Sequence, residues 1–194
     1  MTDNTPTLEK LHAAVEEWIG VPDHVVELRH EGADEGLLRE LDVAFLLPTD
    51  NPRDDDITTA MTVGLGLHTL PQLDPRVELV LEIKGKLSEE EQTRVAHDLG
   101  KMIIERLRKG LYLDPGTLVP AVIHPFASMP YLLLKHWTTT PTHLPFLEPN
   151  VLILRAIPLY ESETKVVEEV GDLAANRLKG KGAVFEDYER PAAA

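Results

Sequence analysis

Two consecutive segments decide the fold: Ile57-Thr-Thr-Ala-Met-Thr-Val-Gly-Leu-Gly-Leu-His68 and, after a turn rich in Pro and Asp, Arg76-Val-Glu-Leu-Val-Leu-Glu-Ile-Lys-Gly85. In the second segment apolar residues alternate with polar ones, which is the period of a strand with one buried and one solvent-facing side. The apolar positions are Val77, Leu79, Leu81 and Ile83. Val80 is the one break in the polar side.

The first segment has the same period with a different second side. Met61, Val63 and Leu65 share one side, whereas Gly64 and Gly66 leave the other almost without side-chain bulk. A glycine-lined surface lets another backbone approach closely. We therefore expect the two segments to be neighbouring strands of a central sheet.

The rest of the chain predicts further strands and three helices. Strand-like segments are His24–His30, Leu41–Leu47, Leu118–His124, Tyr131–Trp137 and Val151–Tyr160, and an extended segment is expected at Ala183–Pro191. Pro120 makes its segment an edge strand or a broken one. Helical spacing predicts helices within residues 1–20, after the capping box at Ser88, and over Glu161–Leu178. We expect one α+β domain over residues 1–194, a central mixed, largely antiparallel sheet with helices packed on it, and an uninformative tail at 192–194.

Composition limits the possible functions. The 194 residues contain no cysteine, which excludes thiol catalysis, thiolate metal sites and disulfides. The net charge is −14, and residues 1–56 carry −11 of it, with 15 Asp/Glu against 4 Lys/Arg. Such a field repels nucleic acid and anionic membranes and favours a basic protein partner, or it simply keeps the protein soluble. Without a signal peptide or a membrane span, we expect a cytoplasmic protein.

Catalytic and cofactor patterns are weak. Ser128 lies near His124 without a nucleophile elbow, and His124, His136 and His143 lack the spacing of a metal site. Gly64-Leu-Gly66 lacks the third glycine of a dinucleotide fingerprint. We therefore expect no catalytic residue, metal or cofactor. A hydrolase or metal-dependent enzyme using Ser128 or the three histidines stays open as the alternative.

Aromatic and acidic residues are the candidates for partner binding. Tyr131, Trp137 and Phe146 cluster in or beside a Pro/Thr-rich loop, where they either anchor a partner or fill a small secondary core. Asp54, Asp55 and Asp56 form an acidic run that is typical of a solvated loop. An edge strand would also be available for strand addition.

Several motifs together resemble the suppressor-of-fused domain. They are Thr62-Val-Gly-Leu-Gly66, Arg76-Val-Glu-Leu-Val-Leu81, Val151-Leu-Ile-Leu-Arg-Ala-Ile-Pro-Leu159 followed by Glu161 and Glu163, and Phe185-Glu-Asp-Tyr-Glu-Arg-Pro191. The resemblance extends from about Leu41 to Pro191. In this family a serine usually stands where this chain has Gly66, and the segment before His124 lacks the usual Gly-His-Thr.

The resemblance implies a non-enzymatic protein-binding domain of α/β type. Animal members sequester a transcription factor by gripping a peptide as an added strand, and bacterial members are regarded as immunity proteins that neutralise toxins. This chain looks like a single-domain bacterial member. The acidic N-terminal part agrees with an immunity role against a basic toxin. The sequence does not indicate the oligomeric state.

Overall fold

The structure is a computed structural model that describes residues 7–29, 40–49, 56–67, 76–137, 143–144 and 151–193. Its strands are β1 (His24–Arg29), β2 (Glu40–Leu46), β3 (Ile57–Val63), β4 (Arg76–Lys84), β5 (Leu118–Pro120), β6 (Tyr131–His136), β7 (His143–Leu144) and β8 (Val151–Leu159). Its helices are α1 (Leu8–Trp18), α2 (Glu89–Arg108), α3 (Glu161–Val170) and α4 (Ala174–Gly180), with 3-10 turns η1 (Leu65–Leu67) and η2 (Gly171–Leu173).

The two deciding segments are neighbouring strands, as predicted. β3 and β4 pair antiparallel, with Ala60 opposite Leu81 and Met61 opposite Val80. The strand order is β1-β2-β3-β4-β8-β6-β5, and β7 also pairs with β8. The β4–β8 pair is parallel and the other described pairs are antiparallel. The predicted mixed, largely antiparallel sheet is therefore confirmed.

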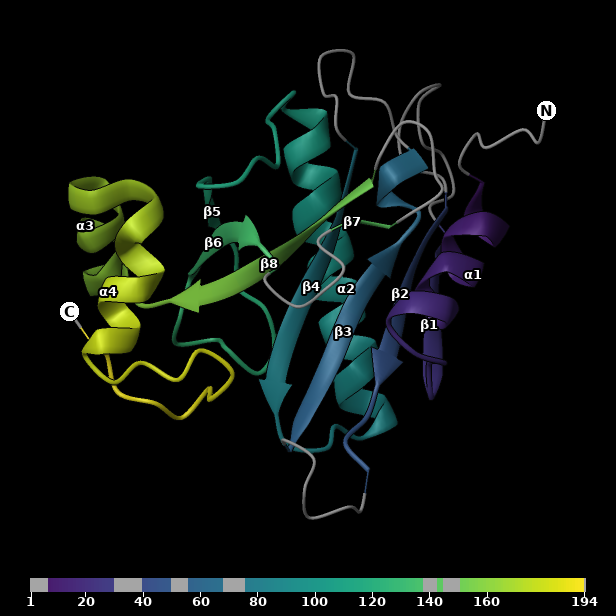
Figure 1. The fold of residues 1–194 in the computed structure, drawn as a ribbon, viewed down its shortest axis with the longest axis horizontal. Helices are drawn as coiled ribbons and strands as arrows, with labels where there is room; N and C mark the ends of the chain where they lie inside the picture. The colour runs from purple at the N-terminus through teal and green to yellow at the C-terminus, as the bar shows by residue number, and fades with distance from the viewer. Residues whose placement is uncertain are drawn as a thin grey trace.

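Helices cover both faces of this sheet (Figure 1). α2 lies behind the sheet and buries an apolar stripe, which includes Val95, Leu99 and Ile103, in the larger core. Its N-terminus has the predicted capping box, in which Ser88 and Glu91 satisfy each other's backbone N–H groups. On the opposite face, α1 packs over the β2–β3 region, and α3 and α4 pack near the end of β8.

The prediction of a solvent-facing side for β4 was wrong for the middle of the strand, although Lys84 at its end is exposed. Val77 and Leu79 pack in the α2 core, but Val80 packs in the α1 core, and Glu78 on that second side is fully buried. Both faces of β4 are covered because α2 packs on one face, and α1 together with Trp137 packs on the other. The break at Val80 was the sequence signal for this burial.

The prediction for the end of the first segment also needs correction. β3 stops at Val63, and the chain turns at Gly64, whose φ of +115° favours glycine. Leu65 therefore packs in the α2 core, on the other side from Met61 and Val63. The expected close approach of another backbone is found at Gly64, where a methyl group would lie 3.2 Å from the Glu40 carbonyl oxygen. At Gly66 a methyl group would meet side chains, with Val151 Cγ1 at 3.0 Å and Glu78 Oε1 at 3.2 Å.

Two predicted strands differ from the structure. β5 ends at Pro120, so the segment up to His124 is mostly a loop, and β5 lies at a sheet edge as its proline indicated. Residues 183–191 form turns without a strand. The expected C-terminal helix is interrupted at Gly171, which has a φ of +53°.

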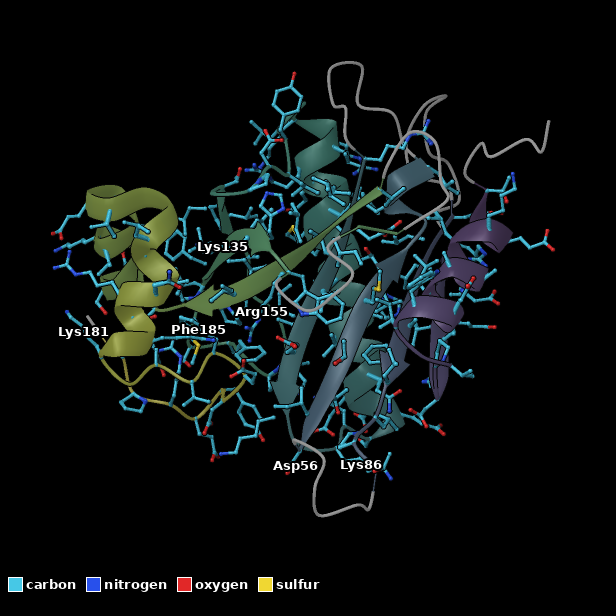
Figure 2. The ribbon with its side chains drawn as sticks, in the orientation of Figure 1. Asp56, Lys86, Lys135, Arg155, Lys181 and Phe185 are labelled. Carbon is cyan, nitrogen blue, oxygen red and sulfur yellow. The ribbon has the colours of Figure 1, made fainter. Side chains whose placement is uncertain are left out.

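Arg190 fixes the C-terminal segment to β8 and α3. Its guanidinium donates two hydrogen bonds to the Glu163 carboxylate, at 2.6 and 2.7 Å, and one to the Pro158 carbonyl at 3.1 Å. The same guanidinium stacks over the rings of Tyr160 and Phe185, and Figure 2 shows Phe185 in this region beside α4. The buried ion pair explains why two motifs that are distant in the sequence, around residues 161–163 and 185–191, occur together among the motifs of the family resemblance.

We expect Arg190→Ala to lower the free energy of unfolding by about 3–5 kcal/mol, because it leaves the Glu163 carboxylate buried and uncompensated. Arg177→Ala is the matched control. It breaks the exposed pair with Glu169 and should cost less than about 1 kcal/mol. Urea denaturation of both variants measures the difference. Equal losses in the two variants would contradict the structural role of Arg190.

Candidate functional site

A groove of about 610 Å³ runs between α2 and β1. Its apolar floor is made by Leu28 of β1, Leu41 of β2 and Ile104 of α2. Gly100 lets the helix approach the strand, since a methyl group there would lie 2.6 Å from Leu28 Cδ1. The remaining lining residues are charged or titratable: Glu27, Arg29, His97, Lys101, Glu105 and Arg108. The groove thus combines an apolar floor with a rim of both charge signs.

β1 is an edge strand of the sheet in the described part of the chain. It runs over six residues and contains no proline. Such an edge presents backbone N–H and C=O groups on its outer side, which another extended chain can pair with. β5, at the opposite edge, has only three residues and ends in Pro120, so it is a poorer template for pairing.

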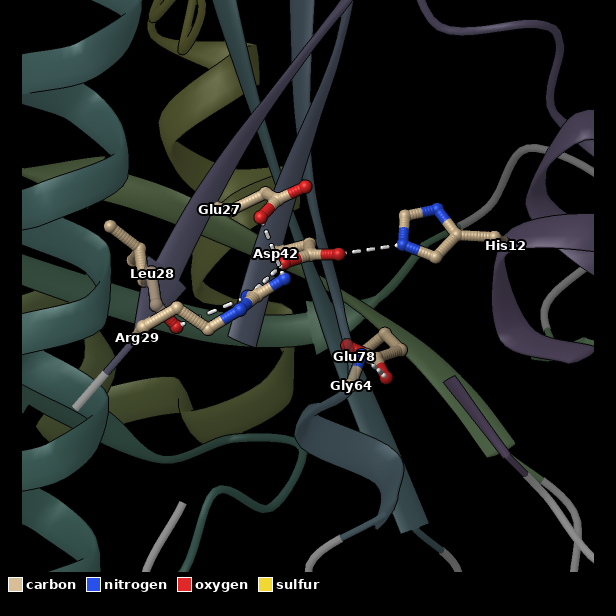
Figure 3. A network of polar contacts seen from close by, with 7 residues as sticks. All are labelled: His12, Glu27, Leu28, Arg29, Asp42, Gly64 and Glu78. Carbon is tan, nitrogen blue, oxygen red and sulfur yellow. Dashed lines mark hydrogen bonds and ion pairs between the residues drawn. The ribbon is translucent and has the colours of Figure 1, made fainter. Parts of the chain in front are cut away.

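A network of charged groups holds the end of β1 (Figure 3). Asp42 of β2 is 3% exposed and accepts hydrogen bonds from Arg29 at 2.7 Å and from His12 of α1 at 2.8 Å. Arg29 also pairs with Glu27 at 3.0 Å. The hydrogen bond to Asp42 and the nearby carboxylates raise the pKa of Arg29. α1 and β1 are therefore joined through one buried carboxylate.

A second cavity of about 420 Å³ lies on the other flank of α2. Tyr131 lines it together with Pro120, Pro130 and Val122, whose side chain is 61% exposed. Tyr131, one of the three predicted aromatic anchors, thus lies beside a cavity.

The other predicted partner-binding residues lie elsewhere. Trp137 is 6% exposed, packs in the α1 core and donates from its indole nitrogen to Glu82 at 3.4 Å. Asp56 is exposed at the start of β3, at the lower end of the sheet in Figure 2. Phe146, Asp54 and Asp55 lie outside the described residues. The structure therefore does not bring Tyr131, Trp137 and Asp56 to one surface.

The fold brings together only part of the residues of the alternative enzyme hypothesis. His136 and His143 lie opposite Leu154 and Leu152 on the same edge of β8, whereas His124 lies apart from them, between β5 and β6. Ser128 is exposed in the same connection. In the described ranges, no three His, Asp or Glu residues are arranged to hold a metal ion.

None of the described helices is long and apolar enough to cross a bilayer.

Glu78 is a fully buried ionisable group with a strongly shifted pKa. Burial raises its pKa from 4.5 to about 7, against the opposing effect of hydrogen bonds from Thr62, Gly66 and Gly64. A carboxyl group with such a pKa can act as a general base or acid if a substrate can reach it. Neither cavity described above is lined by Glu78. Its hydrogen bonds instead hold the turn after β3, which is a structural role.

Sequence reasoning did not find the groove between α2 and β1. Its floor joins residues from positions 28, 41 and 104, which are far apart in the chain. Gly100 was the available signal, because glycine weakens the middle of a helix by roughly 1 kcal/mol relative to alanine and so indicates close packing there.

Comparisons with known proteins agree on the fold. The family model described as suppressor of fused protein (SUFU) matches residues 38–191. A chain in the crystal structure of the Sufu–Fu complex is similar with a TM-score of 0.68 and 11% identity, covering 98% of this chain and 93% of that one. Drosophila Suppressor of Fused gives a TM-score of 0.60 and 10% identity, covering 96% of this chain. No curated protein matches the sequence.

This chain spans half of the Drosophila protein, and identities of 10–11% establish the shared fold alone. The family model, in contrast, covers most of the sequence and includes β3, β4, β8 and the segment that carries Arg190. The chain therefore belongs to the suppressor of fused (SUFU) family.

Proposed function

We propose that this chain is a non-enzymatic protein-binding domain that takes an extended segment of a partner along the edge of β1. The observation that carries the proposal is the apolar groove beside a proline-free edge strand. An added strand gains backbone hydrogen bonds from the edge, and its side chains gain apolar contacts from the groove. The crystal structure of a similar Sufu chain is that of a complex with Fu, which supports partner binding as the general role.

The scaffold around the groove suits this role. The floor residues Leu28 and Ile104 are partly buried against the large core, so they are held in place before a partner arrives. Arg29 is fixed by Asp42 and Glu27. A preorganised site loses less conformational entropy on binding than a flexible one. The whole described chain, from residue 7 to 193, then acts as one domain.

The test uses random peptides displayed on phage and selected against the purified domain. We expect Ile104→Asp to weaken the selected peptides at least tenfold, because it places a charge on the apolar floor. The control is Leu173→Asp, in the 64% exposed position of η2 far along the chain from the groove. Circular dichroism checks that both variants are folded.

Backbone methylation of a selected peptide tests the strand geometry independently of folding. In antiparallel or parallel pairing, alternate residues direct their N–H groups to the neighbouring strand. N-methylation should therefore abolish binding at every second residue and be tolerated between them. Binding that survives methylation at every position would contradict strand addition.

We further propose that the natural partner is a basic toxin and that the chain is its cytoplasmic immunity protein. The support is the charge of −11 in residues 1–56 and the absence of cysteine, which is compatible with a reducing compartment. Electrostatic steering would speed binding of a basic partner. Co-expression with the partner recovered at low salt should abolish the toxicity of that partner. A recovered partner that is harmless to cells by itself would contradict the immunity role.

A further inference from the structure

We infer that the segment which pairs with β1 has two different faces: apolar side chains at alternate positions enter the groove beside α2, and Lys or Arg side chains at the intervening positions lie on the α1 side. This inference rests on the proposed function, because it needs an extended segment on the β1 edge. It adds the chemical pattern of that segment.

The two faces of β1 have different surroundings. Val26 and Leu28 pack towards the α2 core, whereas Val25 packs towards the α1 core. Glu27 and Arg29 alternate with Leu28, so their side chains leave β1 on the α1 side, where Asp42 binds Arg29, and both residues also border the groove at the strand edge. Side chains of an added strand stand beside those of β1 on the same two faces. Its alternate positions would therefore meet two different environments.

The α1 side of this edge is acidic. Glu27 has an exposed side chain, and Glu40, opposite Arg29 in the β1–β2 register, is exposed too. Asp42 lies between them, and Arg29 is the cation that these three carboxylates share. Glu16 adds an exposed carboxylate, because it lies one turn after His12, the α1 residue that contacts Asp42. Among the described residues, four carboxylates therefore lie near one guanidinium and the His12 imidazole, which favours a cationic partner side chain here.

The α2 side of the edge has the opposite preference. Its floor is apolar, and the charges that rim it on α2 are mixed, with Lys101 and Arg108 beside Glu105. Such a surface gains most from burying aliphatic side chains. A partner strand that alternates apolar and basic residues matches both sides at once, whereas a strand with carboxylates on the α1 side would meet like charges.

Synthetic peptides of about eight residues test the pattern. Three peptides share one apolar face of Val residues and differ in the other face: alternating Arg-Val, alternating Ser-Val and alternating Glu-Val. A block peptide of four Arg followed by four Val is the control, because it has the composition of the Arg-Val peptide without the alternation. We expect the Arg-Val peptide to bind roughly tenfold more tightly than Ser-Val, as two exposed ion pairs would give, and Glu-Val to bind most weakly. The block peptide should not bind more tightly than the Ser-Val peptide.

Adjacent glutamates provide a matched pair of variants. Glu16→Lys, on the flank of α1 that carries His12, should reduce the preference for Arg-Val over Ser-Val, and adding Glu27→Lys should abolish it. Glu17→Lys has the same charge change on the other flank and should leave the preference unchanged. Equal effects of Glu16→Lys and Glu17→Lys, or equal affinity for all alternating peptides, would overturn the inference and leave strand addition standing. If no alternating peptide binds, or if the domain pairs β1 with a second copy of itself, the proposed function fails as well.

Discussion

A buried carboxylate at the end of the central strand pair is the interaction on which the rest of the structure depends. Glu78 Oε1 accepts hydrogen bonds from the backbone N–H groups of Gly64 and Gly66, at 3.0 and 2.9 Å. Its Oε2 atom accepts from the Thr62 hydroxyl at 2.6 Å. Thr62 in turn accepts from the Leu79 N–H at 2.8 Å. Buried backbone groups are costly when unpaired, and here one side chain satisfies two of them where the chain leaves β3.

Buried carboxyl groups stabilise this fold at two separate places. The edge of β1 differs from these two places, because its residues are more exposed. Glu78 closes the turn after β3, and Glu163 with Arg190 attaches the C-terminal segment to β8. At β1, the strand residues are only partly buried or exposed, apart from the anchoring contact to Asp42. Strand addition needs an edge strand on a rigid support, which is the combination found at β1 in the described part of the chain.

The sequence predicted the fold well where a local pattern had one physical meaning. The capping box at Ser88 and the edge position of the Pro120 strand follow from backbone hydrogen bonding alone. Alternation in β4 identified the strand, but it could not distinguish a solvent-facing side from a buried one. Glu78 has the same place in the pattern as an exposed glutamate, and its partners Gly64 and Gly66 appear in the sequence only as small residues.

The candidate site was less accessible to sequence reasoning, because sites depend on contacts between distant residues. Trp137 follows a strand and precedes a Pro/Thr-rich loop, which is typical of a surface anchor, yet its indole lies against Glu82 and the α1 core. The groove joins β1 to α2 over a separation of about seventy residues. Neither the burial of Trp137 nor the groove can be predicted from the periodicity of one segment, because each depends on residues from distant parts of the chain.

The pH dependence of stability tests the central role of Glu78 most directly. Because its pKa is about 7 in the folded chain and 4.5 ordinarily, the folded state binds this proton more tightly than the unfolded state does. Its contribution to stability is therefore complete below about pH 4.5 and is lost as the pH rises through 7. Glu78→Gln keeps an oxygen acceptor for Gly64 and Gly66 and removes the titration.

The measurement is the free energy of unfolding of the wild type and of Glu78→Gln between pH 5 and 9, from urea denaturation. The wild type should lose up to roughly 3 kcal/mol relative to the variant across this range, since one pKa unit corresponds to about 1.4 kcal/mol. Taking the difference cancels the titration of the histidines, which both proteins share. A difference that stays constant from pH 5 to 9 would contradict a buried, proton-binding carboxyl group at the centre of this fold.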